Sequence, residues 1–294
     1  MLYPLNFGTN PNIYYSKSMN PFTVREALIL FLQEDIGHGD VTSDAIFSHE
    51  QIGTAQFIAK QPFLTAGIAT FASEVFKLVN PNITVEPLPD GQRVGPGDIV
   101  LTANGPVLDL LKAERVALNL AQRLCGIATL TADFVEQVAL LPVKIVDTRK
   151  TTPGLRLFEK YAVRIGGGYN HRFNLSDGIL IKDNHIAAAG SISKAIKHVR
   201  SNAPHTIRIE VEAETIDQVN ECLECEIDAI LLDNMNCETM RKAVSINQGK
   251  ALLEASGGIS LENVREVAET GINIISIGAL THSATARDIS MRMV

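Results

Sequence analysis

Positive charge in this chain is concentrated in one segment, residues 143–182. The segment holds eight basic residues and three acidic ones, so its net charge is +5, whereas the whole chain carries −7 and the remainder therefore −12. Its basic residues are Lys144, Arg149, Lys150, Arg156, Lys160, Arg164, Arg172 and Lys182. An acidic protein with one basic segment is typical of a protein that binds a small anion, whereas nucleic-acid binders usually have a basic surface overall. The alternative is a solvated helix face, but several of these cations adjoin apolar runs or glycines, which favours a ligand.

Polar residues also end a series of apolar, strand-like runs in the second half of the chain. The runs are residues 143–148, 178–183, 206–213, 229–235, 251–257 and 274–280. The residues at their ends are Asp147, Thr148, Arg149, Lys150, Lys182, Asp183, Glu210, Glu212, Asp233, Asn234, Glu254, Ser256, Gly257, Gly258, Gly278 and Ala279. If the strands are parallel, their carboxyl ends share one face, where ligands of α/β barrels bind. Because polar residues recur at the ends of successive strands on one face, a shared polar site is favoured over separate solvated charges.

Two consecutive strand-to-helix turns are rich in glycine and small residues. Ser256, Gly257 and Gly258 precede one predicted helix, and Gly278 and Ala279 precede the next. Glycines allow close approach of a ligand to the backbone, and helix N-termini offer unpaired N–H groups to anions. Ordinary turns, with Ser260 as an N-cap, are the alternative, but two in succession favour a phosphate site.

Glu212 and Asp233 are carboxylates at the ends of adjacent predicted strands. Beside a basic cluster they could bind Mg²⁺, hold sugar hydroxyls or stabilise a developing positive charge. The alternative is a structural ion pair with Lys182. The run Gly166 to Gly168 lacks the GxGxxG spacing of dinucleotide-binding folds, and His171 taken alone is more often structural than catalytic.

The elements that must position these residues differ between the two halves. In the second half, strand-like runs begin at 206, 229, 251 and 274 and alternate with amphipathic helix candidates, which predicts repeated βα units and a parallel sheet. About six units are visible, so we expect an incomplete, open α/β barrel. The first half mixes helix-like residues 22–35 and 66–79 with strand-like residues 53–66 and 83–105, an α+β module. Residues 106–140 read as a long helix.

The predicted domain division has four parts. They are a tail at 1–20, an α+β domain at 21–125, the barrel at 126–280, and a segment at 281–294 that could pack back on the first domain.

Composition limits the class of protein. The chain has 294 residues, 46 % of them hydrophobic and 20 % charged, as in an ordinary globular protein. We expect no membrane span and no signal peptide, hence a cytoplasmic protein with four reduced cysteines. Cys222 and Cys225 have metal-ligand spacing, but they fall on one helix face with no second pair, which disfavours zinc. The absence of tryptophan further disfavours a base-stacking surface.

Several motifs together resemble those of one enzyme family. They are EDIGHGDVTSDAI (34–46), ERVALNL (114–120), DTRKTTPGLR (147–156), GGGYNHRFNLSDGILIKDNHI (166–186), IEVEAET (209–215), ILLDNM (230–235), LEASGGIS (253–260) and ISIGALTHSA (275–284). The sequence is similar to quinolinate phosphoribosyltransferase, also called decarboxylating nicotinate-nucleotide pyrophosphorylase, from about residue 22 onward.

The resemblance implies a reaction and an assembly. Quinolinate and phosphoribosyl pyrophosphate would give nicotinate mononucleotide, CO2 and pyrophosphate, a step of NAD biosynthesis. The implied fold is an N-terminal α+β sandwich-like domain followed by an open α/β barrel. The implied assembly is a homodimer or homohexamer in which Arg115 reaches the partner's site; read without the resemblance, Arg115 is a surface helix residue.

The resemblance also implies roles for individual residues. Those expected to bind quinolinate are Arg115, Arg149, His171, Arg172 and Lys182, with Thr148 and Lys150 at the same pocket. Glu212 and Asp233 would lie beside the ribose and Mg²⁺. The phosphate turns would be formed by Ser256, Gly257, Gly258, Gly278 and Ala279. Lys150, Glu212 and Asp233 are the expected catalytic residues, Lys150 stabilising or protonating the carbanion left by decarboxylation.

Three other functions are considered beside this one. Lys182 at a strand end could form a Schiff base, as in an aldolase. The barrel could bind anions without catalysis. A related phosphoribosyltransferase could use a different pyridine-like acceptor.

Overall fold

The computed structural model describes residues 19–294, and its contacts divide the chain into two units. One unit contains the described residues as far as Leu130 together with Leu157–Gly167 and Ala284–Val294; the other contains Thr131–Arg156 and Gly168–Ser283. This division differs from the one expected from the sequence at residues 126–130 and 157–167, which the sequence division places in the barrel. The predicted tail lies almost wholly outside the described residues.

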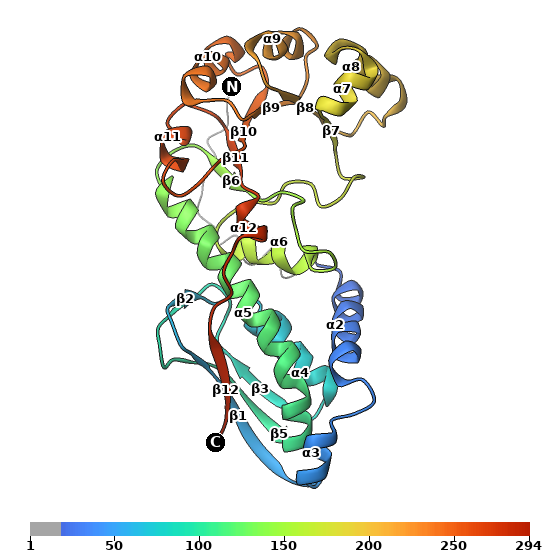
Figure 1. Cartoon of the computed structure of the whole chain (residues 1–294), viewed down its shortest axis with the longest axis vertical. Helices are drawn as coiled ribbons and strands as arrows, with labels where there is room; N and C mark the ends of the chain where they lie inside the picture. The colour runs from blue at the N-terminus through green and yellow to red at the C-terminus, as the bar shows by residue number, and fades with distance from the viewer. Residues whose placement is uncertain (1–18) are drawn as a thin grey trace. The chain divides into compact units, whose positions relative to one another are not determined.

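The second unit is built on a six-stranded parallel sheet (Figure 1). Its strands are β6 (Lys144–Val146), β7 (Ile179–Ile181), β8 (Ile209–Ala213), β9 (Ala229–Asp233), β10 (Leu252–Ser256) and β11 (Ile274–Ser276). They pair in the order β6-β11-β10-β9-β8-β7, so β6 and β7 are the edges and the described barrel is open between them. The predicted open barrel and all six of its strands are confirmed.

Helices follow the strands and lie outside the sheet (Figure 1). They are α7 (Asp183–Ala189), α8 (Ile192–Asn202), α9 (Ile216–Glu224), α10 (Cys237–Asn247), α11 (Val264–Ala268) and α12 (Ala279–His282). Side chains of Ser191, Thr215 and Asn236 accept backbone N–H groups at the starts of α8, α9 and α10, which satisfies otherwise unpaired donors. Helix α7 was not predicted, whereas α8 to α11 lie at the helix candidates between the later strands.

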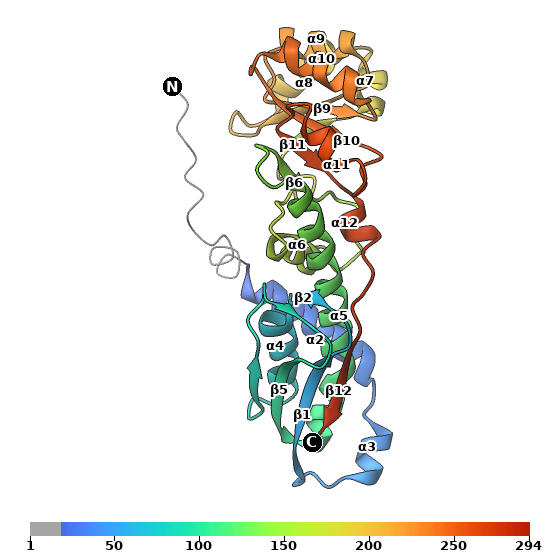
Figure 2. The ribbon, with the colours of Figure 1, turned by 90° about the vertical axis from the view of Figure 1, so that its left-hand side faces the viewer.

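The first unit contains an antiparallel sheet in the order β12-β1-β5-β3 and a two-stranded ribbon, β2-β4. Its strands are β1 (Ile52–Ala59), β2 (Phe63–Leu64), β3 (Thr84–Pro87), β4 (Arg93–Val94), β5 (Ile99–Pro106) and β12 (Ile289–Met293). Both views show the C-terminal strand β12 beside β1 (Figures 1 and 2). Ala55, Phe57 and Ala59 alternate as buried residues along β1, as in a strand with one buried face.

Aromatic rings join three of the helices of the first unit. The helices of this unit are α2 (Pro21–Ile36), α3 (Val41–Ile46), the π-helix η1 (Ile68–Ala72), α4 (Ser73–Val79), α6 (Arg156–Ile165) and α5 (Val107–Gln137), whose last turns belong to the second unit. Phe158 of α6 packs against Phe31 of α2 and Phe71 of η1, with ring centroids 5.7 and 4.8 Å apart. Phe57 packs against Phe76, which joins β1 to α4.

Helix α6 was missed because its sequence is strongly charged. Glu159 is nevertheless fully buried, and its Oε1 accepts a hydrogen bond from Nε of Arg123 at 2.8 Å. Pairing with arginine offsets the cost of burying a carboxylate. Among the described helices, none is long and apolar enough to cross a membrane.

Gly126 on α5 provides a test of how the C-terminal segment packs. A methyl group there would lie 2.2 Å from the backbone oxygen of Thr285. Replacing a helical glycine with alanine ordinarily stabilises a protein by about 1 kcal/mol, but overpacking costs roughly 1–3 kcal/mol. We therefore expect Gly126→Ala to lower the free energy of unfolding, measured by denaturant titration.

Gly95→Ala is the matched control, because its nearest neighbouring atom would lie 3.9 Å away. A Gly126→Ala protein more stable than the unsubstituted chain would contradict the packing of residues 284–294 against α5.

Candidate active site

The carboxyl ends of the barrel strands surround a cavity of about 580 Å³. Side chains from all six strands or the loops that follow them line it, because parallel strands end on one face of the sheet. The lining residues are Thr148, Arg149, Lys150, His171, Arg172, Leu180, Lys182, Glu212, Leu231, Asp233, Asn234, Glu254, Ser256, Gly257, Gly258 and Ser276.

The cavity unites most of the residues selected from the sequence. Thr148, Arg149, Lys150, His171, Arg172, Lys182, Glu212, Asp233, Ser256, Gly257 and Gly258 all line it. Arg115, Gly278 and Ala279 do not. Arg115 is exposed on α5, and Gly278 lies against Lys150, since an added Cβ would approach the Lys150 Cδ to 2.8 Å.

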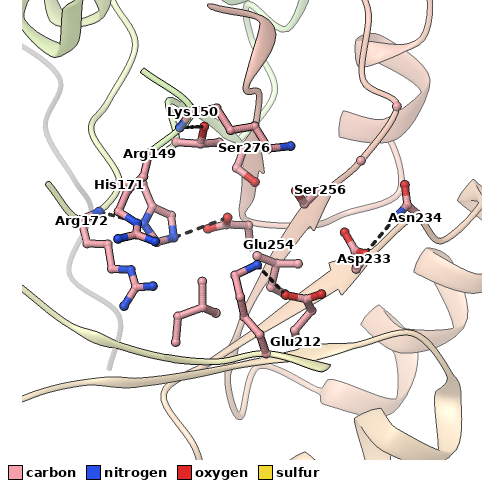
Figure 3. Close-up of a pocket in the computed structure, with 16 residues that line it drawn as sticks. Arg149, Lys150, His171, Arg172, Glu212, Asp233, Asn234, Glu254, Ser256 and Ser276 are labelled. Atoms are coloured by element: carbon pink, nitrogen blue, oxygen red, sulfur yellow. Dashed lines mark hydrogen bonds and ion pairs between the residues drawn. The ribbon is translucent and has the colours of Figure 1, made fainter. Parts of the chain in front are cut away.

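Charge in the cavity is polarised. Arg149, Lys150 and Arg172 lie on one side, and Glu212 and Asp233 lie on the other (Figure 3). The fourth cation of the cavity, Lys182, is paired with Glu212. A site of this kind suits a ligand that carries anionic groups at one end and a cationic or hydroxyl-rich group at the other.

Hydrogen bonds fix the loop that carries Lys150. The Lys150 N–H donates to Oγ1 of Thr148 at 3.0 Å, and the Thr281 hydroxyl donates to the Lys150 carbonyl oxygen at 2.8 Å. The Thr281 hydrogen bond joins the loop after β6 to the residues after β11 and so restrains Lys150 at the edge of the cavity.

Two arginines in the cavity repel each other. Burial and the charge of Arg149 lower the pKa of Arg172 from its usual value. One Arg172 Nη donates to the carbonyl oxygen of Gly178 at 2.7 Å, which restrains the guanidinium despite this repulsion. An anion between the arginines would relieve their repulsion.

Four of the eight basic residues in the segment 143–182 do not line the cavity. The prediction that the charge of this segment serves a ligand therefore holds for only half of its cations. Lys160 and Arg164 are buried in α6, Arg156 donates to Thr151 and to the Phe173 carbonyl oxygen, and the Lys144 Nζ lies 5.1 Å from the centre of the Tyr169 ring. These four cations therefore support local structure, because none of them lines the cavity.

Glu212 and Asp233 lie on adjacent strands, as predicted, since β8 pairs with β9. The ion pair that we considered as an alternative is also present: Nζ of Lys182 lies 2.9 Å from Oε2 of Glu212. Asp233 accepts a hydrogen bond from the side-chain nitrogen of Asn234 at 2.9 Å. The two carboxylates offer hard oxygen donors of the kind that Mg²⁺ prefers.

With this geometry established, comparisons with known proteins identify the family. Models of the N-terminal and C-terminal domains of quinolinate phosphoribosyl transferase match residues 40–125 and 127–292. The chain belongs to the quinolinate phosphoribosyltransferase family.

Individual relatives agree with this family. A "probable nicotinate-nucleotide pyrophosphorylase [carboxylating]" of Bacillus subtilis is 47 % identical, over 93 % of this chain and 94 % of the relative. A "quinolinate phosphoribosyltransferase [decarboxylating] 2, mitochondrial" of Nicotiana glauca is 41 % identical, over 92 % of this chain and 82 % of its own length. The crystal structure of NadC from Streptococcus pyogenes has a TM-score of 0.90 at 43 % identity, covering 94 % of this chain and 98 % of its own.

Five lining residues of this quinolinate phosphoribosyltransferase family member were not selected as site residues: Leu180, Leu231, Asn234, Glu254 and Ser276. Glu254 and Asn234 were noted only as residues at strand ends. Strand alternation could have identified Glu254 and Ser276. They lie two positions before Ser256 and Gly278, and residues two apart on a strand share one face of the sheet.

Asn234 adopts a backbone conformation that depends on its neighbour. Its φ is 53°, in the left-handed region, and its N–H donates to the Ser256 carbonyl oxygen at 2.9 Å. Gly257 has φ 93°, and an added Cβ would lie 2.1 Å from Oδ1 of Asn234. The glycine therefore leaves room for the side chain that contacts Asp233.

We expect Gly257→Ala to destabilise the protein more than Gly258→Ala, measured by thermal unfolding. Both glycines have a positive φ, but an added Cβ at Gly258 meets no atom within 4 Å. An alanine in the left-handed region costs about 1–2 kcal/mol at either position, and only Gly257→Ala adds a collision with Asn234. Equal losses of stability in the two variants would contradict the contact.

Proposed function

We propose that this chain joins quinolinate to phosphoribosyl pyrophosphate and releases CO2 and pyrophosphate, giving nicotinate mononucleotide for NAD biosynthesis. The family membership supports the reaction, and the observation that carries it to these residues is the polarised cavity. Cations gather where a pyridine dicarboxylate would bind, and carboxylates gather where a ribose that becomes cation-like would lie.

Arg149, Arg172 and Lys182 bind the two carboxylates of quinolinate in this proposal. Arginine gives bidentate contacts to carboxylates, and lysine offers a compact charge. Lys182 forms an ion pair with Glu212, and this pair lies at the boundary between the acceptor and the ribose in this proposal. The Lys182 Nζ is engaged by the Glu212 carboxylate, which disfavours its use as the nucleophile of a Schiff-base aldolase.

Glu212 and Asp233 bind the ribose region and Mg²⁺, directly or through substrate. The magnesium ion, when bound, would neutralise charge on the departing pyrophosphate. Ser256, Gly257 and Gly258 present backbone N–H groups to a phosphate, and Gly278 and Ala279 are proposed to complete the phosphate turns. The support is the chemistry of the donors: hard carboxylate oxygens beside a glycine turn with space for an anion.

The bond changes follow from this arrangement. The bond from C1′ to the pyrophosphate oxygen breaks, and the carboxylates stabilise the cation-like ribose. The pyridine nitrogen then bonds to C1′ and becomes positively charged. This charge permits loss of the adjacent carboxylate as CO2, because the electron pair left on carbon lies beside N⁺. Lys150, with Thr148 next to it, stabilises that carbanion or donates the proton that it takes up.

We propose a homodimer or homohexamer in which Arg115 completes the partner's site. The support is the resemblance, together with the exposure of Arg115 on α5 and its absence from the residues that line this chain's cavity. A cytoplasmic location remains a prediction from the sequence.

We expect Lys150→Ala and Glu212→Ala each to lower turnover by about 10²–10³-fold, the usual effect of removing one electrostatic contact to a transition state. Formation of nicotinate mononucleotide and release of CO2 from carboxyl-labelled quinolinate measure the effect. Lys242→Ala is the control, because that lysine is exposed on α10 and pairs only locally with Glu238.

Unchanged turnover in both variants, with unfolding temperatures intact, would contradict the assignment of the site. In the same assay, a chelator should abolish turnover and added Mg²⁺ should restore it. Binding of both substrates without pyrophosphate release would instead support an anion-binding barrel.

A further inference from the structure

His171 was grouped with the ligand-binding cations, but its ring nitrogens face the protein. The backbone N–H of Arg172 donates to its Nδ1 at 2.8 Å. A nitrogen that accepts a hydrogen bond carries no proton, so the ring is a neutral imidazole protonated on Nε2.

The other nitrogen, Nε2, points toward two carboxyl groups. It lies 3.1 Å from Oε2 of Glu210 and 3.7 Å from Oε1 of Glu254, and Figure 3 shows the ring directed at Glu254 across the cavity floor. The Nε2–H therefore donates toward the carboxyl pair, and no ring nitrogen is left to donate to a substrate carboxylate.

Glu254 is the more deeply buried of the two carboxyl groups, and its pKa is raised. The residue is 3 % exposed, and its buried Oε1 has no hydrogen-bond partner among the described residues. Burial, followed by the negative charge of Glu210, raises the pKa of Glu254 to about 7. Glu254 and Glu210 thus form a close pair of carboxyl groups on the side of the cavity toward which the His171 ring points.

The backbone of His171 is also fixed. Its N–H donates to Oδ1 of the fully buried Asp147 at 2.9 Å, and the neighbouring Asn170 donates to the second oxygen of the same carboxylate. The ring thus connects Glu210 on β8 and Glu254 on β10 to the backbone of Arg172, whose guanidinium lines the cavity. The backbone of His171 is held separately by Asp147, which follows β6.

We propose that His171 is a positioning residue: a neutral imidazole that links the Glu210–Glu254 carboxyl pair to the backbone of Arg172 and so fixes the direction of the Arg172 guanidinium. It does not bind the pyridine dicarboxylate as a cation. The effect on substrate binding rests on the proposed function, whereas the protonation of the ring does not.

The first experiment reads the proton directly. Long-range proton–nitrogen correlation spectra of protein labelled with ¹⁵N-histidine, at pH 7, should show His171 protonated on Nε2 and not on Nδ1; the signals that vanish in His171→Gln assign the residue. An imidazolium, or a ring protonated on Nδ1, overturns the proposal. A ring without a proton on Nε2 would indicate that the three side chains bind a metal ion, which overturns it as well.

The second experiment measures quinolinate binding by calorimetry. Glutamine is neutral and can donate to Glu210 through its amide, so His171→Gln should bind within about threefold of the unsubstituted protein, whereas His171→Ala should bind about tenfold more weakly, or 1.4 kcal/mol. His198→Gln, at an exposed position on α8, is the control. Equal weakening in His171→Gln and His171→Ala would overturn the proposal.

These two experiments separate the inference from the proposed function. The spectra need neither substrate nor turnover, so failure of the phosphoribosyl transfer would leave the expected tautomer in place. Conversely, a charged His171 in an active enzyme would overturn only the inference.

Discussion

Repulsion among cations at the open end of a parallel sheet is the interaction on which this site depends. Two unit charges 4 Å apart interact with about 1 kcal/mol in water and about 4 kcal/mol near a protein surface. The fold holds Arg149, Lys150, Arg172 and Lys182 around one cavity, and only Lys182 among them has a carboxylate partner within salt-bridge distance in the described residues. Binding of a dianion between the cations would relieve this repulsion. The relief contributes favourably to the free energy of binding.

The scaffold opposes that repulsion with contacts made below and beside the cavity. Thr281 holds the Lys150 loop, the Gly178 carbonyl oxygen holds Arg172, and Lys182 is held by Glu212. The carboxyl pair beneath the floor supplies negative charge without competing for the ligand. Preorganisation of this kind lowers the entropy lost on binding, and here it depends on hydrogen bonds that restrain the loops.

Much of this could be predicted from the sequence, and the failures have physical causes. The regular spacing of strand-like runs predicts the six barrel strands, and the positions of Lys182, Glu212 and Asp233 at strand ends predict that they meet. Helix α6 escaped prediction because four of its ten residues are charged, yet three of these, Glu159, Lys160 and Arg164, are buried. Lys160 and Arg164 were counted in the charge of the basic segment, because composition does not distinguish a buried cation from one that faces a cavity.

Glu254 and His171 show a second limit. The carboxyl of Glu254 lies two positions before the turn that was noted, and the register of β8, β9 and β10 aligns it with Glu212. Its approach to Glu210 is seen only in the structure, where the His171 ring lies close to both carboxyls. The His171 ring is directed by a hydrogen bond to the next residue's backbone, a local geometry that sequence patterns do not encode. Long-range register and ring orientation therefore require the structure.

Calorimetry that compares quinolinate with nicotinate, which lacks one carboxylate, tests the central claim most directly. A hydrogen bond to a charged group contributes about 1.5–3 kcal/mol, so quinolinate should bind at least about tenfold more tightly, and added salt should weaken its binding more than that of nicotinate. Equal affinities, with equal responses to salt, would contradict the account.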